Sequence, residues 1–517
     1  MPEPIAASGR SASAEGSPGF DLGKLGLYIA TFMAVFDIAV VYLALPSIER
    51  SIRATLADQV WIASAYGLTE AGFTLAAGTL GDLYGRRRVY IGGVIVFTLA
   101  SIASGLAPTP ILLIVARFIQ GIGGAIMMAL PLAILCSMVD GEVQTSKTIR
   151  LFATIAGMGA VAGPVLGGLL ISAFGWRAVF FVNVPISLFV LFTALRYTTE
   201  SERDPQLRLD LGGQAASILT LLAFSFTAIE GNTLGWWSWP IGASAIVTVL
   251  GAISFVWIEG HAQCPMLRFD ALSNALLSVG TWSMLMMNIG FFTLYLIASL
   301  FIQNVRGVGP LAAGWLLLAN NALFFLTNEY SSPLTERIGQ PAAVVAGMGL
   351  GLVGLASFAF FHTWTPAAYA MIPLGLCGLG WGLAFTPLNT LAMKRVPREE
   401  DGLASGLLNI GRPLGAVFGT AIFGAVLAGT MSASVAAALA TLHAAPGTVE
   451  AIAAATHSSG LWSLSGTAQS YGLPAGSLRA AINAGFMTGM HISGIAASLG
   501  SAVVIVYALR VYRRERA

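Results

Sequence analysis

The feature that most constrains the fold of this chain is a series of apolar stretches, each about as long as a bilayer-crossing helix. A helix needs about 20 predominantly apolar residues to cross the hydrocarbon core of a membrane. We predict about fourteen such spans, at 22–46, 59–80, 89–107, 111–138, 149–173, 178–197, 211–230, 239–258, 275–299, 311–330, 342–361, 367–392, 402–428 and 481–511.

Composition supports this prediction. Of the 517 residues, 56% are hydrophobic and 10% are charged, whereas a soluble domain carries about 25% charged residues. A chain with so few charges cannot cover a water-facing surface, so we predict an all-α integral membrane protein. The three cysteines, Cys136, Cys264 and Cys377, lie far apart in the sequence, and we predict neither a disulfide nor a metal site.

The basic residues predict the orientation. An even number of spans puts both ends of the chain on one side, and cytoplasmic segments are enriched in Lys and Arg. One predicted side carries clusters such as Arg86–Arg88 and Arg513 with Arg514. The other side carries Arg50, Arg53, Arg177, Arg306 and Arg479. We therefore predict a multi-pass protein of the inner (cytoplasmic) membrane with both termini in the cytoplasm, beginning with a disordered tail at 1–21.

Short segments recur about 255 residues apart, which indicates an internal duplication. The recurring pairs are Asp82 with Glu336, Gly85 with Gly339, Pro131 with Pro387, Gly159 with Gly415 and Gly163 with Gly419. We predict two six-helix bundles at 22–200 and 261–517, separated by two extra transmembrane helices in 201–260. A long external loop at about 430–480 belongs to the second bundle. We interpret it as a packing cap, with a substrate gate as the alternative.

Three ionisable residues, Asp37, Glu70 and Arg117, lie inside predicted spans. A charged side chain at the bilayer centre costs about 2.5–3.5 kcal/mol on insertion scales, so such residues usually have a function or a partner inside the bundle. Arg117 shares one helix face with Gln120 and Gly121. We predict that Arg117 pairs with Asp37 or Glu70 and that these three residues couple transport to protons. The alternative is a static structural ion pair.

Two further motifs stand out. The loop after the second span contains Gly78, Asp82, Gly85, Arg86 and Arg87. The fifth span contains Gly159, Gly163, Pro164, Gly167 and Gly168. Small residues at this spacing allow close helix contact, and a proline inside a helix interrupts its hydrogen-bond ladder. From the residues alone, the second motif predicts close packing together with a bend.

Together, the order of these motifs from about 25 to 510 resembles the major facilitator superfamily, and within it the fourteen-helix drug:proton antiporter branch. The resemblance includes the segments 175–185 and 402–412. It implies that Asp82, Arg86 and Arg87 form a cytoplasmic latch between the halves. It also implies that Arg117 and Asp37 take part in proton coupling, and that the fifth-span glycines and Pro164 shape the antiport motion. The corresponding second-half motif residues are Glu336, Arg337, Gly339 and Arg412.

This sequence departs from the family pattern at three positions. Leu83 replaces a basic residue after Asp82. Ala39 and Tyr42 replace polar residues that commonly follow the acid of the first span. These departures affect the expected latch and the surroundings of Asp37.

We predict a proton-coupled exporter of small drug-like or amphipathic organic molecules that works by alternating access. The predicted partners are the substrate, protons and the lipid bilayer, with no nucleic acid, no cofactor and a monomeric state. Aromatic residues are the predicted cavity lining: Phe36, Trp282, Trp315 and Trp381. The alternatives are a major facilitator importer or uniporter and a non-transporting membrane sensor. The sequence contains no HExxH motif and no P-loop, so we predict no enzymatic activity.

Overall fold

The structure, a computed structural model, describes residues 21–201, 203, 209–262, 269–394, 396, 401–458, 460–464 and 468–516. The predicted tail, apart from Asp21, and Cys264 lie outside the described residues. The described part of the chain is helical and contains no strand, which confirms the all-α prediction.

The first half contains the spans α1 (Leu22–Ile52), α2 (Leu56–Tyr84), α3 (Arg86–Leu106), α4 (Pro110–Ser137), α5 (Glu142–Phe174) and the pair α6 (Ala178–Phe181) and α7 (Asn183–Tyr197). The extra hairpin follows as α8 (Leu211–Leu234) and α9 (Trp239–His261). The second half contains α10 (Ala275–Leu300), α11 (Pro310–Tyr330), α12 (Ser332–Ile338), α13 (Gln340–Ala356), α14 (Met371–Met393), α15 (Asp401–Asn409), α16 (Gly411–Thr441), α17 (Pro446–Ser458), α18 (Leu461–Leu464) and α19 (Ser477–Arg516).

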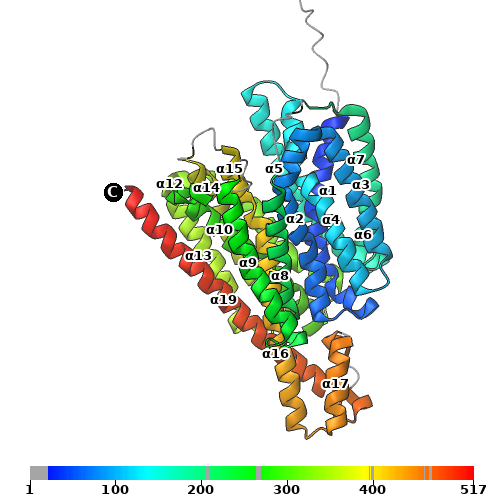
Figure 1. Cartoon of the computed structure of the whole chain (residues 1–517). Coiled ribbons are helices and arrows are strands. Elements are labelled where there is room, and N and C mark those ends of the chain that lie inside the picture. The colour runs from blue at the N-terminus through cyan, green and yellow to red at the C-terminus, as the bar shows by residue number, and fades with distance from the viewer. Residues whose placement is uncertain are drawn as a thin grey trace, which may run out of the picture.

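Each of the fourteen predicted spans corresponds to a helix or a pair of abutting helices. Within the described residues, thirteen helical segments are long and apolar enough to cross a membrane. The remaining predicted span is α2, which is more polar but has 29 residues, a length of about 43 Å. It runs along α4 through the body of the bundle (Figure 1). The main difference from the prediction is length, since α1 continues past Pro46 to Ile52.

The two halves repeat the same local geometry. Gly85 separates α2 from α3 with φ 100°, and Gly339 separates α12 from α13 with φ 84°. Glycine adopts positive φ without the clash that a Cβ would cause. In the first half Gly159 of α5 lies against the backbone of α1, and in the second half Gly419 of α16 lies against the backbone of α10. The pair α1 and α5 in the first half and the corresponding pair α10 and α16 in the second half therefore both pack through glycines.

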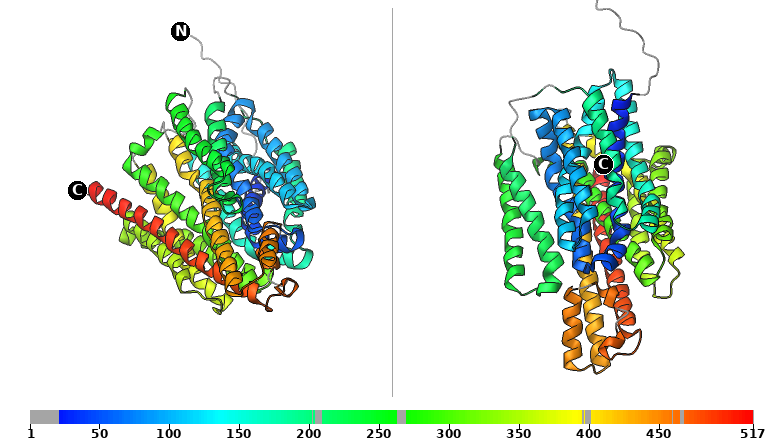
Figure 2. Two further views of the ribbon diagram at one scale, coloured as in Figure 1. Left: turned by 60° about the horizontal axis from the view of Figure 1, so that its bottom comes forward. Right: turned by 90° about the vertical axis from the view of Figure 1, so that its right-hand side faces the viewer.

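The extra hairpin stands beside the junction of the two halves (Figure 2). Its first helix, α8, packs against α2 of the first half and α16 of the second half. Trp61 Nε1 donates a hydrogen bond of 2.8 Å to Glu230, and Asn232 Nδ2 donates one of 2.7 Å to the carbonyl of Ala425. The hairpin is thus attached to both halves through α8, while most of α9 is exposed.

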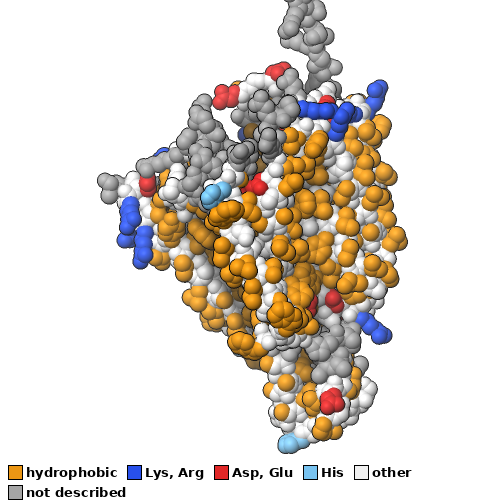
Figure 3. All heavy atoms as spheres, in the orientation of Figure 1, with side chains coloured by type: hydrophobic (Ala, Val, Ile, Leu, Met, Phe, Trp, Pro, Cys, Tyr) orange, Lys and Arg blue, Asp and Glu red, His pale blue; other side chains and the backbone are white. Residues whose placement is uncertain are grey.

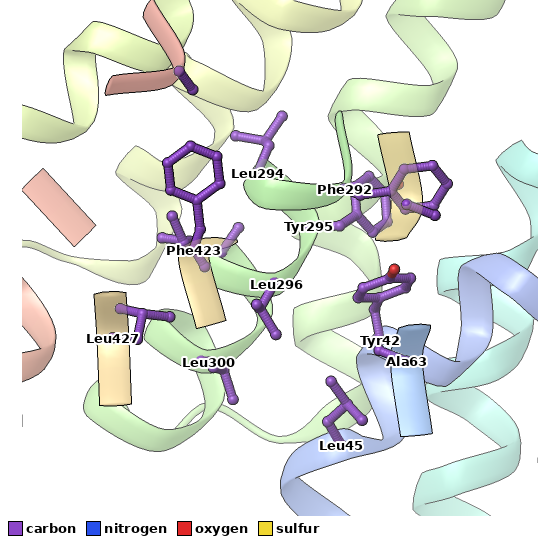
Figure 4. Close-up of a cluster of buried hydrophobic side chains, with 14 of the residues drawn as sticks. Tyr42, Leu45, Ala63, Phe292, Leu294, Tyr295, Leu296, Leu300, Phe423 and Leu427 are labelled. Carbon is purple, nitrogen blue, oxygen red and sulfur yellow. The ribbon is translucent and has the colours of Figure 1, made fainter. Parts of the chain in front are cut away.

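The surface and the core both fit a protein embedded in lipid. Apolar side chains cover the sides of the bundle, and charged side chains gather toward its ends (Figure 3). Between the halves, Tyr42 of α1 packs against Phe292 and Tyr295 of α10, with ring centroids 5.7 and 6.3 Å apart (Figure 4). This cluster joins the first and second halves through apolar contact.

The packing of α1 on α5 predicts a clear stability effect. A Cβ at Gly159 would lie 2.6 Å from the carbonyl oxygen of Phe32, so Gly159→Val must push α1 and α5 apart. Overpacking of this kind costs about 1–3 kcal/mol, and we expect a lower melting temperature in detergent. The matched control is Gly92→Val in α3, because a Cβ there meets nothing within 4 Å. Equal melting temperatures for the two variants would contradict this account of the contact.

Candidate functional site

A buried ion pair joins α1 to α4 inside the first half. Arg117 Nη1 donates a hydrogen bond of 2.6 Å to Asp37 Oδ2. The exposed fractions of the two side chains are 2% and 0%. The sequence left Asp37 and Glu70 as possible partners of Arg117, and the structure places Asp37 there.

The second oxygen of Asp37 is bound by two amides. Asn183 Nδ2 at the start of α7 donates to Oδ1 at 2.7 Å, and Gln120 Nε2 of α4 donates at 3.0 Å. Gln120 also donates to Ser101 Oγ of α3 at 2.9 Å and accepts from Arg117 at 2.8 Å. A carboxylate without solvent is stable only when its oxygens are hydrogen-bonded. Four spans of the first half therefore meet at Asp37, namely α1, α3, α4 and the span formed by α6 and α7.

The guanidinium of Arg117 also contacts an aromatic ring of α2. Its carbon lies 4.6 Å from the centroid of Tyr66, a favourable cation–π geometry. Gly121 allows α2 to approach α4 this closely, because a Cβ at Gly121 would lie 2.4 Å from the carbonyl oxygen of Tyr66. The predicted grouping of Arg117, Gln120 and Gly121 on one face thus has a physical basis: two of them hold Asp37 and the third admits α2.

A second ion pair crosses between the halves. Arg412 Nη2 of α16 donates to Glu70 Oε1 of α2 at 2.5 Å. Glu70 is 2% exposed, whereas the side chain of Arg412 is 33% exposed. Next to this pair, Gly67 of α2 packs against Ala416 of α16. Glu70 therefore holds a cation of the opposite half, a partner that the sequence did not identify.

Tyr66 lies between the two ion pairs. It is one helical turn from Glu70 on α2, and residues four apart share a helix face. Its ring contacts Arg117, and its side chain is 1% exposed. Tyr66 therefore relates the two ion pairs through α2: its ring contacts Arg117, and Glu70 follows one turn later on the same helix. Asp37, Arg117, Tyr66 and Glu70 belong to the first half, and Arg412 belongs to the second half.

The fifth-span motif divides its residues between two neighbours. Gly159, Gly163 and Gly167 lie against α1. Gly168 faces the other way, where a Cβ would lie 2.7 Å from the carbonyl oxygen of Pro310 at the start of α11. The motif therefore allows α5 to pack closely against its own half and against the second half at once.

Pro164 gives this interface a hydrogen-bond acceptor. A proline has no N–H, so the carbonyl four residues earlier, that of Ala160, loses its partner in the helix. Asn321 Nδ2 of α11 donates to that carbonyl. Asn321 is 3% exposed, so the bond is made inside the protein. The sequence predicted an interrupted ladder, and the structure shows which side chain of the other half binds the free carbonyl.

The same arrangement occurs in α1. Pro46 leaves the carbonyl of Tyr42 without its helical partner, and Ser299 Oγ of α10 donates to it at 2.8 Å. Beside it, Gln303 Nε2 donates to the carbonyl of Leu43 at 3.0 Å. These bonds join the halves at the end of the bundle opposite to Asp82. Sequence reasoning missed Ser299 and Asn321, because the acceptors that they bind are backbone atoms of another half.

Within the described residues, the expected latch motif makes its contacts inside the first half. Asp82 Oδ1 accepts from Arg86 Nε at 2.8 Å, within the same turn. Arg87 donates to the carbonyls of Ala194 and Leu195 at the end of α7. Asp82, Arg86 and Arg87 form no hydrogen bond or ion pair with the described residues of the second half. The loop after α2 is instead tied to the last span of its own half.

The remaining predicted residues do not form one site. Gly78 lies in the last turns of α2, Glu336 and Arg337 are exposed on the short helix α12, and Gly339 ends that helix. The four aromatic residues of the predicted cavity lining have different surroundings. Phe36 (3% exposed) packs beside Phe32, and Trp381 (2%) fills the space beside Gly290 and Gly351 inside the second half. Trp282 and Trp315 are about half exposed, at 46% and 57%.

Among the described residues, no group of His, Cys, Asp and Glu side chains is placed to hold a metal ion. The site is therefore built from ion pairs, amides and aromatic rings, which are groups that can bind protons and organic molecules.

Relatives with similar sequences carry names that refer to resistance and efflux. The chain is 35% identical over 406 residues to the Multidrug resistance protein Stp of Mycobacterium tuberculosis, covering 78% of this chain and 75% of that protein. It is 31% identical over 416 residues to the Drug efflux pump JefA of the same organism, covering 80% and 81%. It is 30% identical over 398 residues to the Methylenomycin A resistance protein of Streptomyces coelicolor, covering 77% and 84%.

Solved structures share the fold. A bacterial homologue of the human lysosomal transporter Spinster, in an inward-facing and unoccupied conformation, matches with a TM-score of 0.67 at 17% identity, covering 95% of this chain and 98% of that chain. The POT family transporter PepTSo matches with a TM-score of 0.60 at 12% identity, covering 94% and 99%. At these identities the likeness concerns the fold alone.

The sequence profile of the Major Facilitator Superfamily matches residues 27–420. This match covers more than half of the chain and agrees with the helical architecture and with the relatives above. The chain therefore belongs to the Major Facilitator Superfamily, and it is a multi-pass membrane transporter rather than an enzyme.

Proposed function

We propose that the chain exports small drug-like organic molecules in exchange for protons, with the Glu70–Arg412 pair as the element that connects protonation to movement. The names of the relatives support drug export. The observation that carries the coupling is a buried carboxylate of one half bound to an arginine of the other half.

The coupling follows from the charges of this pair. Ionised Glu70 attracts Arg412 and holds α2 against α16. Protonated Glu70 has no net charge, so the attraction is lost and only a weaker hydrogen bond remains. Because α2 and α16 belong to different halves, a proton changes a contact that must rearrange when the halves rock about a central site. Each proton that moves inward across 100 mV supplies about 2.3 kcal/mol.

The Asp37 cluster has a different place in the proposal. Asp37, Arg117, Gln120 and Asn183 all belong to the first half. Neutralising Asp37 would leave Arg117 buried without its counter-ion, which costs about 3–5 kcal/mol in comparable pairs. We infer that Asp37 sets the position of Arg117 and, through Tyr66, that of Glu70 on α2.

The distribution of basic residues supports an inner-membrane location with both termini in the cytoplasm. In that orientation the bonds of Ser299 and Gln303 lie toward the external side. The structure then corresponds to a state that is closed to the exterior. The proposed partners are one small organic substrate and protons, in a monomer.

Glu70→Gln tests the coupling directly. The measurement uses purified protein in proteoliposomes. The compound is selected from a growth panel that includes ethidium, as one against which cells gain resistance when they express the chain. We expect export driven by an imposed pH gradient to fall by about tenfold or more. Exchange of labelled for unlabelled compound without a gradient should continue, because it needs no change of protonation. The matched control is Glu329→Gln, which neutralises an exposed acid of α11.

The outcomes separate the alternatives. Gradient-driven export at the wild-type rate in Glu70→Gln would contradict the role of this pair. Uptake in the direction of the proton gradient would favour an importer, and no movement of any compound of the panel by the wild type would favour a sensor.

Asp37→Asn should act differently from Glu70→Gln. Because Arg117 loses its counter-ion, we expect a lower melting temperature in detergent together with reduced export. The double variant Asp37→Leu with Arg117→Met removes both charges and should recover much of the stability but not the export. A double variant that exports at the wild-type rate would show that this ion pair is only structural.

The bond between Asn321 and Ala160 makes a further prediction. Pro164→Ala restores an N–H that competes with Asn321 for the Ala160 carbonyl. We expect α5 and α11 to separate more readily at this contact, which changes the rate of gradient-driven export. Asn321→Leu should have a similar effect, and adding it to Pro164→Ala should change little more, because both act on one bond. Fully additive effects on the export rate would contradict this explanation of the proline.

A further inference from the structure

A helical insert leaves the bundle between the last two spans. We define it as the described residues of 442–476, which include α17 and α18 and lie between α16 and α19 in the sequence. It projects beyond the membrane-embedded body at the end of the bundle opposite to the start of α1 (Figures 1 and 2). Both of its connections lead to the second half, so it is covalently part of that half.

The insert is also packed onto the second half. Trp462 Nε1 donates to Asn483 of α19 at 3.2 Å, and its ring lies 5.4 Å from that of Phe486. Ile452 and Leu461 belong to the same buried apolar cluster as the core between the halves. The insert should therefore move together with α16 and α19 as one body.

One carboxylate of the first half meets the insert. Glu49 lies in the last turn of α1 and is 1% exposed. Its Oε1 accepts the backbone N–H of Ser463 at 3.3 Å. Its Oε2 accepts Gln59 Nε2 of α2 and Asn304 Nδ2 of the segment after α10, both at 3.3 Å. Glu49 thus joins the first half, the second half and the insert at a single point.

The contact is very close, and a glycine permits it. A Cβ at Gly460 would lie 2.3 Å from Glu49 Oε1 and 2.4 Å from its Cγ. Within the described residues, Glu49 makes no ion pair, and its bonds come from uncharged groups. A buried carboxylate needs such donors when water is excluded. If the halves separate at this end, the donors from the insert and from Asn304 move away and water must replace them.

We propose that the insert is part of the gate at this end of the transporter, and that Glu49 is the positioning residue that holds it closed. In the closed state the insert lies on α1 and Glu49 binds it to both halves. In the open state the insert moves away with the second half and exposes Glu49. This inference rests on the proposed alternating-access transport, and it assigns the segment at 430–480 to a gate rather than to a passive packing cap.

A reversible cross-link tests the proposal. In a variant with Cys136, Cys264 and Cys377 replaced by Ser, we would introduce Glu49→Cys and Gly460→Cys. The Cγ of Glu49 lies 2.4 Å from the Cβ position of Gly460, so the two Cβ atoms would be no more than about 4 Å apart, which suits a disulfide. The measurement is export of the resistance-conferring compound from proteoliposomes before oxidation, after oxidation and after reduction, with the cross-linked fraction determined from free thiols.

We expect export in the reduced state, loss of export in proportion to the cross-linked fraction, and recovery with reductant. The single-cysteine variants should show no effect of oxidation. Fully cross-linked protein that exports at the reduced rate would overturn the inference while leaving the proposed transport intact. A wild-type protein that exports nothing would instead contradict the proposed function.

In the cross-linked pair, Glu49 itself is replaced by cysteine. A second measurement therefore tests the contribution of the Glu49 side chain without a cross-link. Ser299, which is buried between the halves, is replaced by Cys in the same cysteine-free variant. A membrane-impermeant maleimide is then added from the external side. Glu49→Ala should raise the labelling rate by about tenfold, because a buried carboxylate and its donors are lost. The control Glu450→Ala, an exposed acid of the insert, should leave the rate unchanged, and Glu49→Gln should restore much of the protection. Equal labelling rates for Glu49→Ala and Glu450→Ala would overturn the proposal.

Discussion

The ion pair between Glu70 and Arg412 is the interaction on which our account of this transporter depends. Water is scarce inside a membrane protein, so each buried charge must find a partner within the protein. Glu70 finds it in the opposite half. The charge state of one carboxylate therefore affects how strongly the two halves are held together, without any need for a distant signal.

The other polar contacts follow from the same scarcity of water. Asp37 is satisfied within the first half by Arg117, Asn183 and Gln120, and these bonds connect α1 to α4 and α7. Backbone carbonyls freed by Pro46 and Pro164 are satisfied by Ser299 and Asn321 of the second half. Bonds of this kind are strong enough to define one closed state, yet each can be exchanged for water or for another helix contact when the halves move. Rigid halves joined by exchangeable bonds are what a rocking mechanism requires.

Much of the fold could be predicted from the sequence, because the length of a bilayer-crossing helix is fixed by the membrane. The positions of the spans and the face shared by Arg117, Gln120 and Gly121 follow from apolar length and helical periodicity.

The partner of Glu70 could not be predicted, since Arg412 is 342 residues away and only the packing of α2 on α16 brings the two together. The different surroundings of the four aromatic residues could not be predicted for a related reason. In an apolar helix, periodicity does not show which side faces lipid, so Trp381 and Trp315 could not be told apart. The role of Glu49 was also hidden, because an acid near the end of a span is usually solvated, and here the insert covers it.

The most direct test of the central claim is a distance measurement between the halves at controlled pH. Spin labels at the proposed external ends of α2 and α16, in nanodiscs, would report the separation of the two helices by electron paramagnetic resonance. We predict that lowering the pH shifts wild-type protein toward larger separations, and that Glu70→Gln shows the low-pH distribution at every pH. A Glu70→Gln protein whose distances still change with pH as in the wild type would contradict the claim that Glu70 connects protonation to movement.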